Sequence, residues 1–389
     1  MRDDELQVLG NPQGQDRRKK WHIILAVLFG VMLIVILGIF LHTRFSQNKE
    51  KLGDTTIAPE LQNAVDSLLN VKLEEIDGLQ GQVIVMEVNT GRILAMAGRE
   101  RRYDGKFQPC RNFGYQQEPG QTKITAVLLT LLETGEVSLD DEVDVGEGVW
   151  DVDELQMLDH NWSRGGYGKI TLERALEVSS NIGISKAVQK VFKGKELKYY
   201  EMLDRMSFGK PGAIDGIDEL KPMVFTSPKD SIWASAQLLL NSIGYEGRLA
   251  PIQMLTFYNA IANNGVMVKP SLRKDSVEII NPRIASEENI RKMQIALDHV
   301  VSQGLGRKAG TPILRVAGKS GTAQVGIIES GETEISEFHL SFCGFFPADA
   351  PKYSIIVSMN KLGYPASGGG MAGPLFRDIV EWMKKKHFL

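Results

Sequence analysis

The feature that most constrains this 389-residue chain is an uncharged apolar run near its N-terminus. The stretch Trp21–Leu41, WHIILAVLFGVMLIVILGIFL, contains no Lys, Arg, Asp or Glu. About twenty apolar residues in a helix span the roughly 30 Å hydrocarbon core of a bilayer. The run is longer than the apolar part of a secretory signal, and no small-residue cleavage site follows it. The sequence therefore predicts one transmembrane helix over residues 21–41, in preference to a cleaved signal.

Basic residues predict the orientation of this helix. Residues 17–20 (RRKK) come directly before the run, and such clusters stay on the cytoplasmic side of a membrane. We expect a cytoplasmic tail over residues 1–20 and a single-pass protein of the cytoplasmic membrane, whose remaining chain lies in the periplasm or outside the cell. The polar stretch 42–57 predicts a juxtamembrane linker. Residues 58–389 are expected to form one globular domain.

Charge and composition narrow the possible functions. The formal net charge is -3, so there is no basic excess to indicate nucleic-acid binding. Two cysteines, Cys110 and Cys343, are too few for a disulfide framework. The sequence leaves open whether they pair, and two separate thiols are the simpler expectation. The six histidines show no metal-ligand spacing, so we expect neither a metal nor a cofactor.

Hydrophobic periodicity predicts an α+β fold. Residues 82–88 (QVIVMEV) and 92–97 (RILAMA) flank an Asn-Thr-Gly turn, as the strands of a hairpin do. Three further β-rich runs predict a meander: 313–325, 338–346 and 353–359. Helices are expected around residues 61–69, 122–132, 172–176, 188–191, 251–263 and 374–387. The five strands would form one antiparallel sheet with helices on both faces.

Three short segments stand out when they are considered together. They are 118–124 (EPGQTKI) at the start of a predicted buried helix, 179–181 (SSN) between two helices, and 319–324 (KSGTAQ) on a predicted strand. Serine acyltransferases of the penicillin-recognising group carry Ser-x-x-Lys, Ser-x-Asn and Lys-Thr/Ser-Gly motifs in this order and in these contexts.

Longer stretches agree with the same family, among them residues 81–98, 242–270 and 339–360. From about residue 56 to 389, the chain therefore resembles the transpeptidase domain of class B penicillin-binding proteins. The resemblance implies the α+β fold that this domain shares with serine β-lactamases.

The first motif departs from the family pattern. Gln121 stands at the position of the nucleophilic serine, and Ile124 stands at the position of the lysine that accepts its proton. An amide is no nucleophile for acyl transfer, and Ile124 cannot take up a proton. Thr122 is the one alternative hydroxyl nearby. However, the residue three positions after it is Thr125, so no base would share its helical face.

The resemblance assigns roles to the residues that remain. Lys319 would place positive charge near the terminal carboxylate of a substrate, and the hydroxyls of Ser320 and Thr322 would donate hydrogen bonds to it. Gly321 would let a ligand backbone approach the strand closely.

The second motif and two backbone groups complete the expected site. Ser179 would relay a proton to the leaving group, and Asn181 would hold the substrate amide. The backbone N–H groups of Gln121 and Thr322 would stabilise an oxyanion, and such donors survive a change of side chain. The simpler interpretation is that 179–181 caps a helix and 319–321 ends a strand.

The sequence thus predicts a pseudo-transpeptidase of peptidoglycan assembly, anchored in the membrane by its one helix. It would bind stem peptides or β-lactams without a covalent bond, or dock onto other membrane proteins of cell-wall synthesis. Two alternatives stay open. One is an active D,D-transpeptidase with an unorthodox nucleophile such as Thr122, and the other is a purely structural scaffold with no ligand.

Overall fold

The computed structural model describes residues 32, 55–153, 155–211, 214, 231–274, 277–330 and 333–388, with backbone alone at 231–234, 328–330 and 333. The predicted membrane helix Trp21–Leu41 lies outside these residues apart from Met32, as do the predicted tail and most of the predicted linker. Among the described residues, none of the helices has the length and apolar character needed to cross a bilayer. Residues Thr56–Leu389 form one compact unit.

A six-stranded antiparallel sheet lies at the centre of this unit, in the order β10-β11-β12-β1-β2-β3. The predicted hairpin is β1 (Gly78–Glu87) with β2 (Ile93–Arg101), and the predicted meander is β10 (Ala317–Ser330), β11 (Thr333–Phe346) and β12 (Tyr353–Leu362). Both are confirmed.

The expected count of five strands was wrong, because β3 (Phe107–Pro109) adds a sixth along Arg99–Arg101 of β2. Three residues are too few to leave an alternating pattern in the sequence. Cys110 directly follows this strand and Cys343 lies on β11, and both are free thiols.

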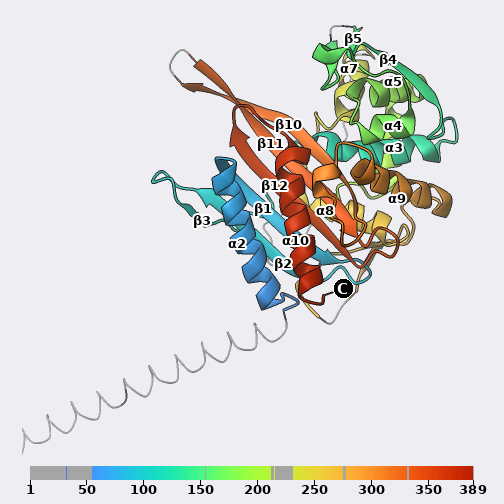
Figure 1. The fold of residues 1–389 in the computed structure, drawn as a ribbon. Coiled ribbons are helices and arrows are strands. Elements are labelled where there is room, and N and C mark those ends of the chain that lie inside the picture. The colour runs from blue at the N-terminus through green and yellow to red at the C-terminus, as the bar shows by residue number, and fades with distance from the viewer. Residues whose placement is uncertain are drawn as a thin grey trace, which may run out of the picture. The chain divides into compact units, whose positions relative to one another are not determined.

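Helices cover both faces of the sheet, as predicted (Figure 1). The apolar side chains of β1 pack on both faces of the sheet. Val83 and Val85 pack in one buried cluster, whereas Ile84 and Met86 pack in the other, because successive side chains of a strand point to opposite faces. The first cluster includes α2 (Pro59–Glu75) and α10 (Gly373–Lys385), and the second includes α8 (Pro251–Ala262).

The other helices pack mainly on the α8 side of the sheet. They are α3 (Ile124–Glu133), α4 (Leu172–Glu177), α5 (Asn181–Phe192), α6 (Glu196–Arg205), α7 (Ser231–Ser242) and α9 (Glu287–Ser302). Short helical turns are η1 (Gly120–Lys123), η2 (Trp162–Arg164), η3 (Arg307–Ala309) and the π-helical η4 (Gly368–Ala372). Three small sheets went unpredicted because their strands have few residues: β4 (Glu142–Gly146) with β7 (Gly168–Thr171), β5 (Val149–Val152) with β6 (Leu155–Leu158), and β8 (Met267–Val268) with β9 (Ile279–Asn281).

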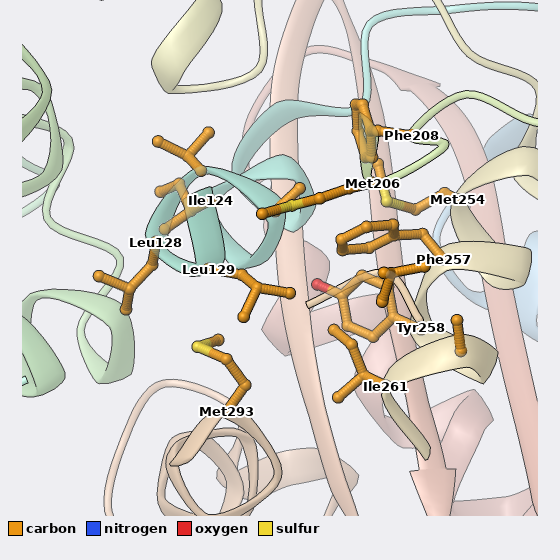
Figure 2. Close-up of a cluster of buried hydrophobic side chains, with 14 of the residues drawn as sticks. Ile124, Leu128, Leu129, Met206, Phe208, Met254, Phe257, Tyr258, Ile261 and Met293 are labelled. Carbon is orange, nitrogen blue, oxygen red and sulfur yellow. The ribbon is translucent and has the colours of Figure 1, made fainter. Parts of the chain in front are cut away.

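The helix α3 is buried nearly all round, as its apolar sequence predicts. Ile124, Leu128 and Leu129 belong to a buried cluster that includes Phe257 and Met293, and Leu129 points toward these two side chains (Figure 2). Since this cluster is tightly packed, α3 holds the preceding turn η1 at a fixed place against the sheet.

Candidate functional site

A groove of about 590 Å³ runs along the edge strand β10. Five residues that the sequence singled out line it: Gln121, Ser179, Asn181, Ser320 and Thr322. The rest of its described lining is His160, Gly304, Leu305, Arg307, Lys308, Ala366, Ser367, Gly369 and Gly370. The three motifs therefore meet at one site, although they are far apart in the sequence.

Gln121 presents its side-chain amide to the groove from η1. Its Oε1 accepts a hydrogen bond from the backbone N–H of Thr322 at 2.9 Å. Its Nε2 donates to Oδ1 of Asn181 at 3.4 Å. The amide thus bridges β10 and the start of α5, and it occupies one of the two backbone donors that we expected for an oxyanion.

Glycines allow η1 to lie close to its neighbours. The N–H of Gly120 donates to the carbonyl of Gly244 at 3.2 Å, and a Cβ on Gly244 would lie 2.0 Å from the Gly120 oxygen. A Cβ on Gly321 would lie 2.7 Å from the Pro119 oxygen. The close approach to β10 that we expected from a ligand at Gly321 is therefore made by the chain's own Pro119, and Gly321 is not among the groove-lining residues.

Lys319 lies behind the groove rather than in its lining. Its Nζ donates to Oγ of Ser179 at 2.5 Å and to the carbonyl of Ser320 at 3.0 Å. The side chain is fully buried, and because burial disfavours the charged form, the pKa of Lys319 is lowered to about 7. Ser179 has a φ of +53°, which is uncommon outside glycine and occurs more often at functional sites.

Two neighbouring residues of the second motif have different positions: Ser180 caps a helix, and Asn181 lines the groove. Ser180 is fully buried and caps α5, since its Oγ accepts the N–H of Gly183 at 2.9 Å and donates to Oδ2 of Asp159 at 2.6 Å. Asn181 instead lines the groove, and its Nδ2 donates to the carbonyl of Leu158 at 3.0 Å. The capping interpretation thus holds for Ser180, whereas the side chains of its two neighbours face the groove.

The three residues that follow Gln121 are turned toward the core. Ile124 is fully buried and packs in the cluster of Figure 2. Thr122 is 1% exposed, and its Oγ1 donates to the carbonyl of Pro119 at 2.8 Å. Lys123 is fully buried, its Nζ donates to Oδ1 of Asn241, and burial lowers its pKa to about 7. The hydroxyl and the amine on this segment therefore both lie outside the groove.

Three basic side chains that the sequence did not predict also line the groove: His160, Arg307 and Lys308. Nε2 of His160 lies 2.6 Å from the hydroxyl of Tyr167, and burial lowers the pKa of this histidine. No carboxylate is among the described lining residues, so the groove suits an anionic ligand. The only sequence signal for Arg307 and Lys308 is their place in the Gly-rich basic segment 303–310 (QGLGRKAG).

Three possible metal ligands meet between α4 and α9. Nδ1 of His299 lies 2.8 Å from Glu173 Oε1 and 4.0 Å from Glu177 Oε1. Spacing in the sequence did not indicate this cluster because His299 comes from a distant helix. Arg174 pairs with Glu177 at 2.5 Å and His299 with Glu173, so the groups already have partners within the chain, and we assign no metal to them.

Comparison with known proteins identifies the class. The family model of the penicillin binding protein transpeptidase domain matches residues 81–381. The chain therefore belongs to the penicillin-binding protein transpeptidase family, as its motifs indicated.

Individual relatives agree with this assignment. Stage V sporulation protein D of Bacillus subtilis is 27% identical over 350 residues, which cover 82% of this chain and 53% of that protein. Penicillin-binding protein PbpB of Mycobacterium tuberculosis is 26% identical over 90% of this chain and 55% of its own. Peptidoglycan D,D-transpeptidase FtsI of Escherichia coli is 24% identical over 84% and 54%. The chain thus spans about half the length of these relatives.

A solved structure shows the same fold. The transpeptidase domain of Burkholderia pseudomallei penicillin-binding protein 3 superposes with a TM-score of 0.71 at 23% identity, covering 86% of this chain and 96% of that one.

Proposed function

We propose that this chain is a catalytically silent penicillin-binding transpeptidase of cell-wall assembly. In this proposal the segment Trp21–Leu41 anchors it in the cytoplasmic membrane, with the globular domain outside. The groove binds peptidoglycan stem peptides, and β-lactams, without an acyl bond, or docks a partner protein of wall synthesis. The observation that carries the proposal is an amide, Gln121, at the position of the family's nucleophile, in a groove that Ser179, Asn181, Ser320 and Thr322 line.

The chemistry of acyl transfer supports the silent character. Covalent catalysis needs a nucleophile and a base that takes its proton. The nitrogen of the Gln121 amide shares its electron pair with the carbonyl, so it neither attacks an ester or amide nor forms a stable acyl product. Ile124, at the position of the base, is apolar and fully buried. The chain therefore has neither a nucleophile nor a base at the two positions where the family carries them.

The binding side of the groove supports recognition of a terminal carboxylate. Ser320 and Thr322 offer hydroxyls in the lining, and Arg307 and Lys308 add positive charge. The Oγ1 of Thr322 accepts the N–H of Gly368 at 2.9 Å, which leaves its own hydrogen available for a ligand. Hydrogen bonds to a charged carboxylate are the stronger kind.

The position of Thr122 speaks against the alternative of an unorthodox nucleophile. Its hydroxyl is almost fully buried and donates to Pro119 O, and Thr122 is not among the lining residues. An attack by this group would require η1 to refold. The remaining alternative, a scaffold that binds no ligand, is distinguished by experiment.

The test is incubation of the full-length protein in detergent with a fluorescent penicillin, followed by denaturing electrophoresis and intact mass. An active penicillin-binding transpeptidase serves as the positive control. We expect no adduct, together with reversible binding by fluorescence anisotropy under native conditions. A stoichiometric increase by the mass of the opened antibiotic would refute the proposal.

The variant Lys319→Ala separates a binder from a scaffold. A binder loses reversible penicillin binding in this variant, because the charge behind Ser179 is gone. A parent protein that binds neither penicillin nor a stem peptide favours the scaffold.

A further inference from the structure

We propose that Gln121 determines the ligand specificity of the groove, because its side-chain amide occupies the position that a ligand peptide unit would take. The groove then recognises its ligand mainly through the terminal carboxylate, and a ligand with a carbonyl at this position must first displace Gln121. This inference rests on the function proposed above and names the part of a stem peptide that the site reads.

The hydrogen bonds of Gln121 match those of a peptide unit. A bound carbonyl needs an N–H donor about 2.7–3.1 Å away, and Oε1 of Gln121 accepts the Thr322 N–H at 2.9 Å. A bound amide N–H needs an acceptor, and Nε2 of Gln121 uses Oδ1 of Asn181 at 3.4 Å. The same side chain therefore holds the carbonyl donor on β10 and the amide acceptor on α5.

Other contacts leave Asn181 little freedom to serve a ligand at the same time. Its Nδ2 donates to Leu158 O at 3.0 Å on the side of the small sheet β5–β6. Both ends of the Asn181 amide thus have partners within the chain. A ligand amide that replaces Gln121 exchanges one set of hydrogen bonds for an equivalent set, so this part of the ligand contributes little net affinity.

We expect the ligand carboxylate to bind beside Ser320, Arg307, Lys308 and the loop at Ser367, which line the groove. The hydrogen bonds of the Gln121 side chain go to Asn181 and Thr322 and leave these groups unused. A Cβ on Gly369 would lie 2.6 Å from the Leu305 carbonyl oxygen and 3.5 Å from Ser320 Oγ, so a glycine here lets the turn η4 lie close to the Leu305 backbone and to Ser320. The basic side chains of Arg307 and Lys308 and the amide position that Gln121 occupies together predict that the parent protein recognises the carboxylate of its ligand.

The experiment compares two ligands on three full-length proteins by ligand-observed NMR titration. N-acetyl-D-alanyl-D-alanine carries a carboxylate and an amide in the position of interest, whereas D-lactate carries a carboxylate and a hydroxyl but no amide. The proteins are the parent, Gln121→Ala, and the matched control Gln108→Ala. Gln108 lies on β3 at the opposite edge of the sheet and bonds Glu100.

In Gln121→Ala we expect the dipeptide to bind roughly five- to tenfold more tightly, the equivalent of about one hydrogen bond. D-lactate should change by less than about twofold in that variant, on the same reasoning. The Gln108→Ala control should match the parent with both ligands.

Equal dipeptide affinity for the parent and Gln121→Ala would overturn the inference and leave the proposed function intact. Equal tightening of both ligands would also overturn it, because the effect would then be general. Failure of the proposed function has a different signature, namely a penicillin adduct on the parent protein. Thermal melts of each variant confirm that the fold is retained.

Discussion

Two buried lysines, Lys319 and Lys123, lie on the two segments that meet at the groove, and they differ in what they contact. Both are fully buried, and burial lowers the pKa of each to about 7. Lys319 reaches Ser179, a lining residue of the groove. Lys123 reaches Asn241, whose Oδ1 also accepts the hydroxyl of Tyr199 at 3.2 Å.

A buried position and a lowered pKa therefore do not by themselves identify a lysine that contacts the groove. Lys319 contacts a residue that lines the groove, whereas Lys123 belongs to a polar network inside the helical part of the unit. Its Nζ also lies 5.9 Å from the ring centre of Phe208. We therefore expect substitutions at the two sites to separate binding from stability.

The largest effect is expected on ligand affinity. Lys319→Met keeps the length of the side chain but removes the charge, and it should weaken binding of a carboxylate ligand by roughly ten- to hundredfold, the range for hydrogen bonds to charged groups. Lys123→Met should stay within about twofold of the parent, because it has no path to the ligand. Titration with N-acetyl-D-alanyl-D-alanine measures both affinities, and equal losses in the two variants would show that Lys319 has no special role in binding.

The next effect is a dependence of binding on pH. The protonated form of Lys319 favours an anionic ligand, and its pKa is about 7 in the free protein. Affinity should therefore fall as the pH rises above about 7, by up to about tenfold per unit. Titrations at pH 6, 7 and 8 measure the slope.

Lys319→Met should abolish this slope. His160 also lines the groove, but burial lowers its pKa, so it loses its proton below its usual range. His160→Gln should therefore leave the slope above pH 7 in place. An affinity that does not change with pH in the parent would show that the charge of Lys319 does not contribute to ligand binding.

A third effect concerns stability. The pKa of Lys123 is about 7 in the folded state and about 10.4 in an unfolded chain. Between these values the unfolded chain binds more protons, so the free energy of unfolding should rise with pH. Lys123→Met should reduce this rise by about 1 kcal/mol per pH unit between pH 7 and 9. Denaturant titrations of the full-length protein in detergent test it, and an unchanged slope would contradict the buried position of the amine.

The smallest effect is expected at Thr122. Thr122→Val keeps the shape but removes the hydroxyl bond to Pro119, which should cost about 1 kcal/mol of stability. Penicillin binding and the absence of an adduct should both stay as in the parent. If the parent forms an adduct and this variant does not, Thr122 is the nucleophile after all.

The sequence predicted those parts of the molecule that local patterns encode. Runs rich in β-branched residues with turn residues between them indicated the β1–β2 hairpin and the three-stranded meander, and the apolar segment after Gly120 indicated a buried helix. The order of the three motifs predicted that Gln121, Ser179 and Lys319 lie together at one site. The missing strand β3 and the small sheets were too short for a periodicity to appear.

The features of the site that were not predicted depend on contacts between residues that are distant along the chain. The orientation of the Gln121 amide depends on the Thr322 N–H, 201 positions away. The motif Ser-Ser-Asn does not say which serine caps the helix, because that choice follows from the buried carboxylate of Asp159. Arg307 and Lys308 belong to no motif and reach the groove only through the fold.

The position of β10 at the margin of the sheet has a consequence for solubility. An open strand margin presents free backbone donors that recruit strands from other molecules. Here Gln121 covers the N–H of Thr322, and the hydroxyl of Tyr245 lies 3.4 Å from the N–H of Gln324. Two of the backbone donors on this margin therefore have side-chain partners within the chain, which leaves fewer donors for a strand of a second molecule.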